Sequence, residues 1–501
     1  MQYRNPVLPG FYPDPSICRV GSDYYLATST FEYFPAIPIF HSRDLVHWRQ
    51  IGHAVSESAY LDLSKATGMS GIFAPAIRYH NGWFYITCTN VLTQGHFIVK
   101  TKKPAGEWSA PIWIDIPSVP MTFDPSLFFD DDRTYLTYFT QNGIQQSEID
   151  PDTGELLTKP RLIATSFAGK FPEGPHLYKI NGLYYLMVAE GGTEYGHMES
   201  IGRADNPWGP FTSCPHNPIL SHRSQHSPIQ VTGHGDIFQD HNGSWWMTFL
   251  AVRPHSYQPV HHLGRETYLA PVDWDSDGWP HVAPVKLEMD ASLPDWTPLE
   301  SLPTRTCFES PRLDLRWNFI RNPDPESWSL TERPGFLRLH GLASGLSDFS
   351  PVAFVGRRQQ HFKVNVAVKL EFKPLSEKNE AGLVIRMNER HHYEIFKTIR
   401  NGEHSLVVRR TIGTLSAETA CVNHPFPGSV LAVNADHEWY HIGYIKDNTF
   451  VELDMAETRY LSTEVARGFT GVYFGMYAAG NGTKCSTPAD FEWLDYDPGE
   501  E

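Results

Sequence analysis

Three acidic residues stand at equivalent points of a repeated pattern in this chain. Asp14, Asp124 and Glu173 are each followed by a tyrosine eleven residues later, and each has a proline as a direct neighbour. Proline restricts the backbone, which suits a side chain whose direction matters. A single acid in such a frame commonly caps a turn. Three acids in one phase of a repeat indicate a shared task instead, because buried like charges are costly.

The chemistry open to such a group is acid–base hydrolysis. Crowded carboxylates push their pKa values apart, so one stays ionised while another stays protonated near neutral pH. In glycoside hydrolysis, one carboxylic acid protonates the leaving oxygen while a carboxylate activates water or attacks the sugar. We expect Glu173, with the longer side chain, to donate the proton and Asp14 to act as the base. Asp124 is then expected to orient Glu173 and raise its pKa.

The pattern around these acids occurs five times. Ala74 precedes Tyr85 and His234 precedes Trp245 by the same eleven residues, and the five leading residues are 60, 50, 49 and 61 positions apart. Most units then contain a polar turn, such as Asn81-Gly82, followed by an aromatic strand. Asn-Gly between apolar runs is a strong hairpin signal. A fixed phase with variable spacers predicts a five-bladed β-propeller, whose equivalent positions converge on its axis.

A second domain follows the repeat. Beyond about residue 310 the strands alternate apolar and polar residues, as in residues 362–372, without helical periodicity. This alternation is typical of a β-sandwich. The sequence therefore predicts an all-β protein, with a propeller over residues 1–305 and a sandwich, a concanavalin-like jelly roll, over residues 306–501.

Composition limits the partners. The net charge of −16 disfavours nucleic acid and anionic membranes. The longest apolar stretches are about half of what a bilayer requires. Met1 leads directly into the first repeat with no visible signal peptide, so we expect a cytoplasmic protein, secreted only if a leader was removed. Six cysteines without CxxC spacing are expected to be free thiols.

Aromatic residues beside the leading positions suggest a carbohydrate site, because sugars present apolar C–H faces to rings. Most aromatic side chains in a propeller are packing residues, so only those next to the leaders or in the aromatic loop are singled out. These are Phe31, Phe73 and Phe123, with the small Ala74 leaving room for a sugar ring.

Two further polar residues are candidates for the site. His234 should face the axis, where it either makes ordinary hydrogen bonds or holds a hard cation through water. Arg265 follows the fifth repeat, and two alternatives are open for it. It either approaches the three acids or forms a surface ion pair with Glu266.

Several long stretches together carry a family resemblance. They include NPVLPGFYPDPS, GIFAPAIRYHNGWFYI, MTFDPSLFFDD, EGPHLYKINGLYYLMVAEGGTEYGH and GHGDIFQDHNGSWWMTFLAVRP. The chain resembles glycoside hydrolase family 43, and most closely its β-xylosidases, over nearly its whole length. The resemblance implies release of xylose, with inversion, from the non-reducing ends of β-1,4-xylo-oligosaccharides. It also implies α-L-arabinofuranosidase side activity.

The resemblance also assigns roles to individual residues. Asp14 matches the family's general base, Asp124 its pKa-modulating acid and Glu173 its general acid. The residues that match those lining the terminal sugar pocket are Phe31, Phe73, Ala74, Thr193, His234 and Arg265. A divalent cation, commonly calcium, is implied near His234, and a homo-oligomer is plausible by analogy with the family. We expect Tyr473 or Phe474 to be the sandwich aromatic that reaches the pocket.

Three differences from the family pattern concern substrate preference. Phe73 stands where tryptophan is usual, Ala36 where glycine is usual, and Phe171-Pro172 precede Glu173 in place of a threonine-rich segment. Other functions also stay open at this point. They are an enzyme that is mainly an α-L-arabinofuranosidase, a non-catalytic sugar-binding propeller, and a retaining fructan hydrolase with its carboxylates only about 5–5.5 Å apart.

Overall fold

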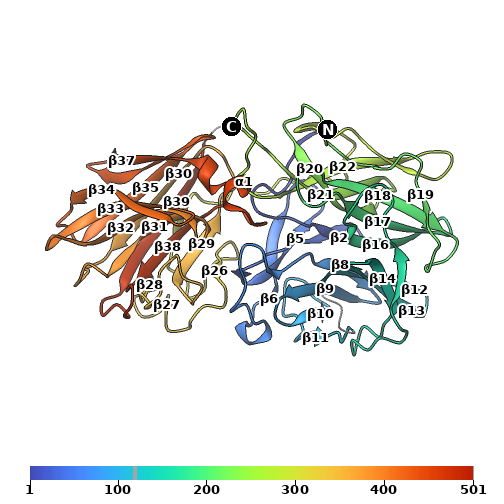
Figure 1. Ribbon diagram of the computed structural model, residues 1–501, viewed down its shortest axis with the longest axis horizontal. Helices are drawn as coiled ribbons and strands as arrows, with labels where there is room; N and C mark the ends of the chain where they lie inside the picture. Colours follow the sequence, from blue (N-terminus) through green and yellow to red (C-terminus); the bar gives the residue numbers. More distant parts are fainter. Residues whose placement is uncertain (117–120, 500–501) are drawn as a thin grey trace.

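The computed structural model describes residues 1–116 and 121–499. Two all-β units lie side by side, a propeller formed by the first part of the chain and a sandwich formed by the second (Figure 1). The N- and C-termini lie on the same side of the molecule, near the junction of the two units. This architecture confirms the predicted fold class.

Five four-stranded antiparallel sheets form the propeller, and each blade is built from one continuous stretch of chain. Blade 2 carries one additional short strand, β7 (Gly71–Ile72). Blades 1 and 2 contain β2 (Ser16–Val20), β3 (Asp23–Ala27), β5 (Ala36–Ser42) and β6 (Arg49–Val55), and then β8 (Ala76–His80), β9 (Trp83–Val91), β10 (Gly95–Thr101) and β11 (Ile112–Trp113). Blades 3 and 4 contain β12 (Thr122–Asp130), β13 (Arg133–Thr140), β14 (Gly143–Glu148) and β15 (Arg161–Ala164), and then β16 (Glu173–Ile180), β17 (Leu183–Glu190), β18 (Met198–Ala204) and β19 (Thr212–Ser213). Blade 5 contains β20 (Gln230–Gln239), β21 (Trp245–Val252), β22 (Glu266–Trp274) and β23 (Pro280–Val282).

The first strands of the five blades form a closed ring. Each of β2, β8, β12, β16 and β20 contacts the next, and β20 contacts β2. The ends of the propeller are joined where β1 (Gln2–Arg4) pairs with β24 (Glu288–Asp290), and by a bridge between Leu8 and Thr267. The recurring positions of the sequence repeat therefore fall on equivalent strands around one axis.

Buried hydrogen bonds connect these five inner strands. The Asp236 carboxylate accepts hydrogen bonds from the Ser16 hydroxyl (2.7 Å) and from Arg78 Nη1 (2.8 Å). Arg78 Nη2 lies 2.8 Å from Nδ1 of His176, which is 3.1 Å from the Ser126 hydroxyl. One residue from each blade takes part, so the ring is held by polar contacts as well as by packing.

Two sheets make up the sandwich, and its core strands alternate as expected. In β30, Val364, Val366, Val368 and Leu370 are buried and the residues between them are more exposed, which is the period-two pattern of a strand with one inward face. One sheet contains β25 (Arg305–Cys307), which spans the predicted boundary, with β27 (Trp328–Ser329), β28 (Leu337–Leu339), β39 (Ala489–Pro498), β30 (Val364–Glu371), β35 (Gly428–Ala435), β36 (Trp439–Lys446) and β37 (Thr449–Glu457). The other contains β29 (Ala353–Arg358), β38 (Tyr473–Ala479), β31 (Glu380–Asn388), β32 (His391–Arg400), β33 (Glu403–Ile412) and β34 (Leu415–Asn423).

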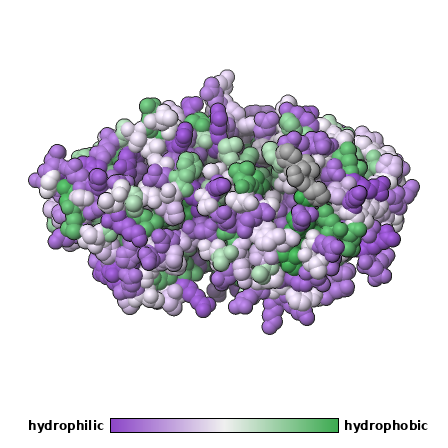
Figure 2. All heavy atoms as spheres, turned by 60° about the horizontal axis from the view of Figure 1, so that its bottom comes forward, coloured by the Kyte–Doolittle hydropathy of each residue, from purple (hydrophilic) through white to green (hydrophobic). Residues whose placement is uncertain are grey.

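In residues 1–116 and 121–499, helical structure is limited to the short turns η1 (Ser58–Tyr60), η2 (Thr458–Leu461) and α1 (Thr463–Ala466). Within the described residues, no helix combines the length and apolar composition needed to cross a lipid bilayer. On the face drawn in Figure 2, hydrophobic residues form separate patches among hydrophilic ones. The homo-oligomer suggested by the family resemblance stays a prediction.

The two units are joined by a shared strand pair and a buried ionic cluster. β4 (Tyr33–Phe34) of the propeller pairs with β26 (Phe319–Ile320) of the sandwich. Beside this pair, Arg386 Nη1 lies 3.0 Å from Glu32 Oε1, and Arg386 Nη2 lies 3.1 Å from Glu389 Oε1. Burial raises the pKa of Glu32 to about 7, although the Arg386 guanidinium opposes that shift. The cluster holds the loop that carries Phe31 against the sandwich.

Replacing Arg386 should destabilise the protein strongly. Arg386→Met removes one of the two guanidinium groups, the other being that of Arg321, that pair with the buried carboxylates, and breaking a buried ion pair costs about 3–5 kcal/mol. Arg305→Met is the matched control, because its pair with Asp495 is half exposed and should cost no more than about 1 kcal/mol. Urea unfolding of both variants measures the difference. Equal, small losses would contradict the assigned role.

Candidate active site

The leading residues of the repeat sit in an unusual backbone conformation. Asp14, Asp124 and His234 have φ values of 55°, 54° and 52°, a left-handed region that non-glycine residues seldom occupy. In blade 4, Gly174 adopts this conformation directly after Glu173. The strand register shifts at this point in blades 3, 4 and 5, which marks β-bulges, and bulges redirect side chains near active sites.

Asp14 is held in a dense set of polar contacts. It is 4% exposed, and its Oδ2 accepts a short hydrogen bond from the Ser29 hydroxyl. Arg265 Nη1 donates to Oδ1 at 2.8 Å, and Nδ1 of His234 lies 3.8 Å from the same oxygen. Three partners therefore fix the direction of this carboxylate.

Arg265 is part of the site, which settles the two alternatives drawn from the sequence. Besides binding Asp14, its Nη1 donates to the Thr193 hydroxyl at 3.1 Å. Glu266 instead pairs with Arg253, whose Nε lies 2.9 Å from Glu266 Oε2. The surface ion pair between Arg265 and Glu266 is therefore wrong, and the buried guanidinium faces the acids.

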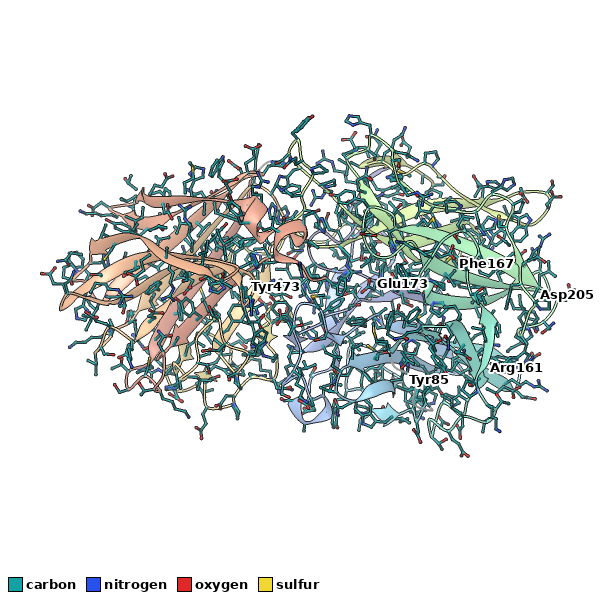
Figure 3. The ribbon with its side chains drawn as sticks, viewed as in Figure 1. Tyr85, Arg161, Phe167, Glu173, Asp205 and Tyr473 are labelled. Atoms are coloured by element: carbon teal, nitrogen blue, oxygen red, sulfur yellow. The ribbon has the colours of Figure 1, made fainter. Side chains whose placement is uncertain are left out.

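Asp124 and Glu173 are joined through the backbone. Oδ2 of Asp124 accepts a hydrogen bond from the Gly174 N–H at 3.0 Å, so it fixes the segment that carries Glu173. The Glu173 side chain is more accessible, at 17% exposed, and its Oε1 lies 4.0 Å from Nδ1 of His197. Figure 3 shows Glu173 in the propeller, where it is the first residue of the inner strand β16.

The site separates the pKa values of its acids. Burial by itself would raise the pKa of Asp14, but Arg265, His234 and the Ser29 hydrogen bond outweigh it and lower that pKa. Burial raises the pKa of Glu173 to about 7, with Arg265 opposing and Asp14 adding to the shift. Burial and then the charges of Glu173 and Asp14 raise the pKa of Asp124 well above its usual range. Below a pH of about 7, Asp14 is therefore ionised while Asp124 and Glu173 hold protons.

Two glycines let the histidines pack between the acids. A Cβ on Gly174 would lie 2.8 Å from Nε2 of His234, and a Cβ on Gly233 would lie 2.4 Å from the His197 ring. Such distances exclude any larger residue without a shift of the ring. Burial lowers the pKa of both histidines, that of His197 to about 3. Neutral imidazoles therefore lie beside the carboxylates.

The predicted aromatic residues gather on one side of the acids. The ring centroids of Phe31 and Phe73 are 5.0 Å apart, and those of Phe73 and Phe123 are 5.6 Å apart. The Arg265 guanidinium lies 5.4 Å from the Phe31 ring centroid. Ala74, at the equivalent point of blade 2, is buried next to Phe73 in the chain. The structure thus brings the predicted binding residues together.

The prediction that Tyr473 or Phe474 of the sandwich reaches the pocket was wrong. Tyr473 belongs to β38 and is fully buried, stacked on Tyr33 with ring centroids 3.8 Å apart, while Phe474 lies in the sandwich core. Figure 3 shows Tyr473 at the edge of the sandwich facing the propeller. Phe469 approaches the site instead, 5.6 Å from Phe31 between ring centroids and 5.5 Å from the Arg265 guanidinium. A residue just before a strand, unlike one within it, is free to leave the sheet.

Three residues of this site were not predicted from the sequence. Ser29 and His197 both carry polar groups onto the acids, and Phe469 comes from the other domain. His197 lies in the quoted stretch EGGTEYGH, which was a usable signal. Ser29 and Phe469 carry no motif of their own, and only the fold brings them to Asp14 and Arg265.

The side chains that the structure describes around His234 do not form a set of direct ligands for a divalent cation. Calcium takes six to eight oxygen ligands. Within residues 1–116 and 121–499, no group of three His, Cys, Asp or Glu side chains converges on a common point at His234. A calcium ion held directly by side chains therefore does not fit here, and coordination through water stays the prediction.

Comparison with known proteins identifies the family. Residues 3–280 match the family described as glycosyl hydrolases family 43. The chain belongs to glycoside hydrolase family 43. Residues 305–497 match the β-xylosidase C-terminal concanavalin A-like domain, in agreement with the predicted jelly roll. The protein is therefore a glycoside hydrolase, as its acids suggested.

Relatives match this family member along nearly its whole length. It is 44% identical to the non-reducing end α-L-arabinofuranosidase BoGH43B of Bacteroides ovatus, over 99% of this chain and 94% of the relative. It is 37% identical to a xylosidase/arabinosidase of Butyrivibrio fibrisolvens, over 98% of each chain. The crystal structure of a xylan β-1,4-xylosidase from Bacillus halodurans superposes with a TM-score of 0.91 at 34% identity, covering 99% of this chain and 100% of that one.

Removing the Phe469 ring should weaken substrate binding more than chemistry. Phe469→Ala deletes an aromatic contact beside Phe31 and Arg265, and such contacts contribute about 0.5–1.5 kcal/mol. We expect kcat/KM for xylo-oligosaccharides to fall about tenfold, mainly through KM. Phe426→Ala, which removes an exposed ring elsewhere in the sandwich, should leave the kinetics unchanged. Equal kinetics of the two variants would remove Phe469 from the site.

Activity should fall as the pH rises through about 7. The roles predicted from the sequence need Asp14 ionised and Glu173 protonated, and the pKa of Asp14 is lowered whereas that of Glu173 is about 7. Above that value Glu173 loses its proton, and kcat/KM should drop about tenfold per pH unit. A profile of kcat/KM against pH measures this limb. A constant rate across neutral and alkaline pH would contradict the assignment of the proton donor.

Proposed function

We propose that this glycoside hydrolase releases single xylose units from the non-reducing ends of β-1,4-xylo-oligosaccharides, with inversion of the anomeric carbon. The observation that carries the proposal is the unequal surroundings of its acids: Arg265, Ser29 and His234 contact Asp14, whereas Glu173 is more exposed. Asp14 is ionised by its contacts while Glu173 keeps a proton up to a pKa of about 7. A non-catalytic sugar-binding propeller would have no need of this division.

In the proposed mechanism, Asp14 takes a proton from water as the water oxygen bonds to the anomeric carbon. The glycosidic C–O bond breaks at the same time, and Glu173 gives its proton to the departing oxygen. Asp124 holds the Gly174 backbone and so orients Glu173. After the reaction Asp14 is protonated and Glu173 is ionised, and proton exchange with solvent restores the starting form.

Exo action is supported by the aromatic rings on the side of the site that faces the sandwich. Phe469 of the sandwich stands beside Phe31 and Phe73 of the propeller, so the side facing the sandwich is covered by rings. Rings on this side of the site favour the binding of a chain end over that of a continuous polymer. Thr193 and Arg265 supply hydrogen-bond donors and acceptors that would face the hydroxyls of the terminal sugar.

A second candidate activity is the hydrolysis of α-L-arabinofuranosides. It is favoured by the 44% identity to a relative named as a non-reducing end α-L-arabinofuranosidase. The same acids and the same geometry serve both reactions, so the two candidates differ only in which sugar fits. The ratio of kcat/KM for nitrophenyl β-D-xylopyranoside and nitrophenyl α-L-arabinofuranoside decides between them.

Two sequence-based predictions extend this proposal. A cation beside His234 would have to be held through water or backbone oxygens, and dialysis against a chelator followed by rate measurement tests its importance. A cytoplasmic location would place the enzyme where short oligosaccharides, not polymers, are its substrates. Cell fractionation of the source organism tests that location.

Variants of the acids should separate their roles. Glu173→Gln should lose orders of magnitude on xylobiose, whose leaving group needs a proton, and much less on activated aryl xylosides. Asp14→Asn should lose activity on all substrates, because none can dispense with the attacking water. Rates on both substrate types measure the difference.

Proton NMR of the first sugar released provides the decisive control. Inversion of a β-xyloside yields α-xylose, which mutarotates only later. If β-xylose forms first, the reaction proceeds with retention and Asp14 acts as a nucleophile instead of a base. An equal loss on both substrate types by Glu173→Gln would exclude Glu173 as the proton donor.

A further inference from the structure

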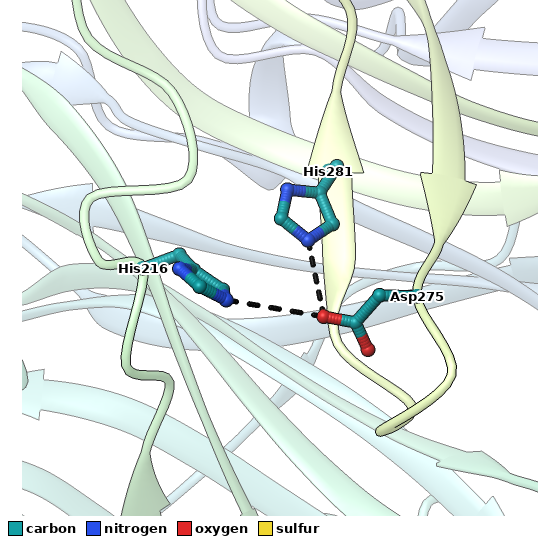
Figure 4. Close-up of side chains that lie close together, drawn as sticks. All are labelled: His216, Asp275 and His281. Carbon is teal, nitrogen blue, oxygen red and sulfur yellow. Dashed lines mark hydrogen bonds and ion pairs between the residues drawn. The ribbon is translucent and has the colours of Figure 1, made fainter.

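A cluster of side chains that could bind a metal ion lies at the rim of the propeller, beside the outer strands of blades 4 and 5. His216 follows β19, the outer strand of blade 4, whereas Asp275 and His281 belong to the turn and outer strand that end blade 5. Nε2 of His281 is 3.1 Å from Asp275 Oδ2, and Nε2 of His216 is 3.9 Å from the same oxygen. Figure 4 shows both imidazoles directed at one carboxylate oxygen.

The carboxylate is oriented by the backbone around it. Oδ1 of Asp275 accepts hydrogen bonds from the N–H groups of Asp277 and Trp279, both at 2.9 Å. Its other oxygen, Oδ2, is left to face the histidines. Arg203 of blade 4 donates to the Asp277 carbonyl, which fastens this turn to the neighbouring blade. Such outer contacts orient metal ligands in known sites.

The histidines are also held by their local structure. His281 lies in β23, paired directly opposite Asp273 of β22. Asp275 comes two residues after Asp273, so the side chains of His281 and Asp275 project from the same face of the sheet. His216 follows Cys214, whose sulfur accepts the His216 N–H at 3.4 Å. The next residue, Asn217, is bound to the Ile201 backbone through its side chain.

The ligand types and spacing fit a transition-metal dication. All three ligand atoms lie within 4.8 Å of one another. Bonds of about 2.0–2.1 Å in a tetrahedron place ligand atoms roughly 3.3 Å apart, so the shorter contact already fits and the exposed His216 ring needs only a small rotation. Two imidazoles and one carboxylate suit Zn²⁺, whereas calcium and magnesium prefer oxygen ligands.

We propose that His216, Asp275 and His281 form a zinc-binding site that links blades 4 and 5 at the rim of the propeller. Three protein ligands leave one coordination position for water. The site is separate from the acids, which lie at the start of the first strands of their blades. Zinc bound here stabilises the folded propeller and does not take part in hydrolysis.

Calorimetric titration of the full-length, chelator-treated protein with zinc chloride tests the proposal. We expect one saturable site per chain. His216→Ala and His281→Gln each remove one ligand at an exposed position, and each should weaken zinc binding at least tenfold. His340→Ala is the matched control, because His340 also pairs with a single carboxylate, that of Glu332 at 3.0 Å, and should not change zinc binding.

Thermal unfolding supplies a second readout. Zinc that binds only the folded protein raises the melting temperature as its concentration increases, and this rise should be lost in both ligand variants. Their hydrolysis rates without zinc should equal that of the wild type. Equal zinc affinity in the wild type and both variants, or no saturable binding to the wild type, overturns the proposal.

Discussion

Five inner strands converge on the propeller axis, where polar groups must find partners within the protein because water has little access. Asp236 meets this constraint for three blades at once, through Ser16 and Arg78, and Arg78 extends the contacts to His176. Ser16 lies two residues after Asp14, and Asp236 two residues after His234. The hydrogen bonds that close the ring therefore also set the positions of the site residues at the start of the same strands.

The sandwich acts on the site through the loop after Ser29. Phe31 belongs to the site, Glu32 is buried against Arg386 of the sandwich, and the adjacent strand β4 pairs with β26. Phe469 of the sandwich also contacts the Phe31 ring of this loop. Without the sandwich, the propeller of this protein would lose the contacts that hold the Phe31 loop and the Phe469 ring beside the site.

Electrostatics divides three similar carboxyl groups into different roles. Arg265 binds Asp14 directly, so that acid is ionised although it is almost fully buried. Asp124 and Glu173 share no such direct contact with the cation, and burial dominates their pKa values. The position of one guanidinium thus separates the pKa of Asp14 from the pKa values of Asp124 and Glu173.

The amino-acid sequence by itself determined the repeat, the five blades, the sandwich and the three acids, because a repeated unit in a closed ring must place equivalent residues together. The family resemblance added Thr193. Only the tertiary structure decided that Arg265 pairs with Asp14 and not with its neighbour Glu266, and that Phe469 and not Tyr473 reaches the site. It also revealed Ser29, His197 and the cluster of His216, Asp275 and His281. These contacts join residues from different blades or domains, and no local pattern encodes which distant side chains will meet.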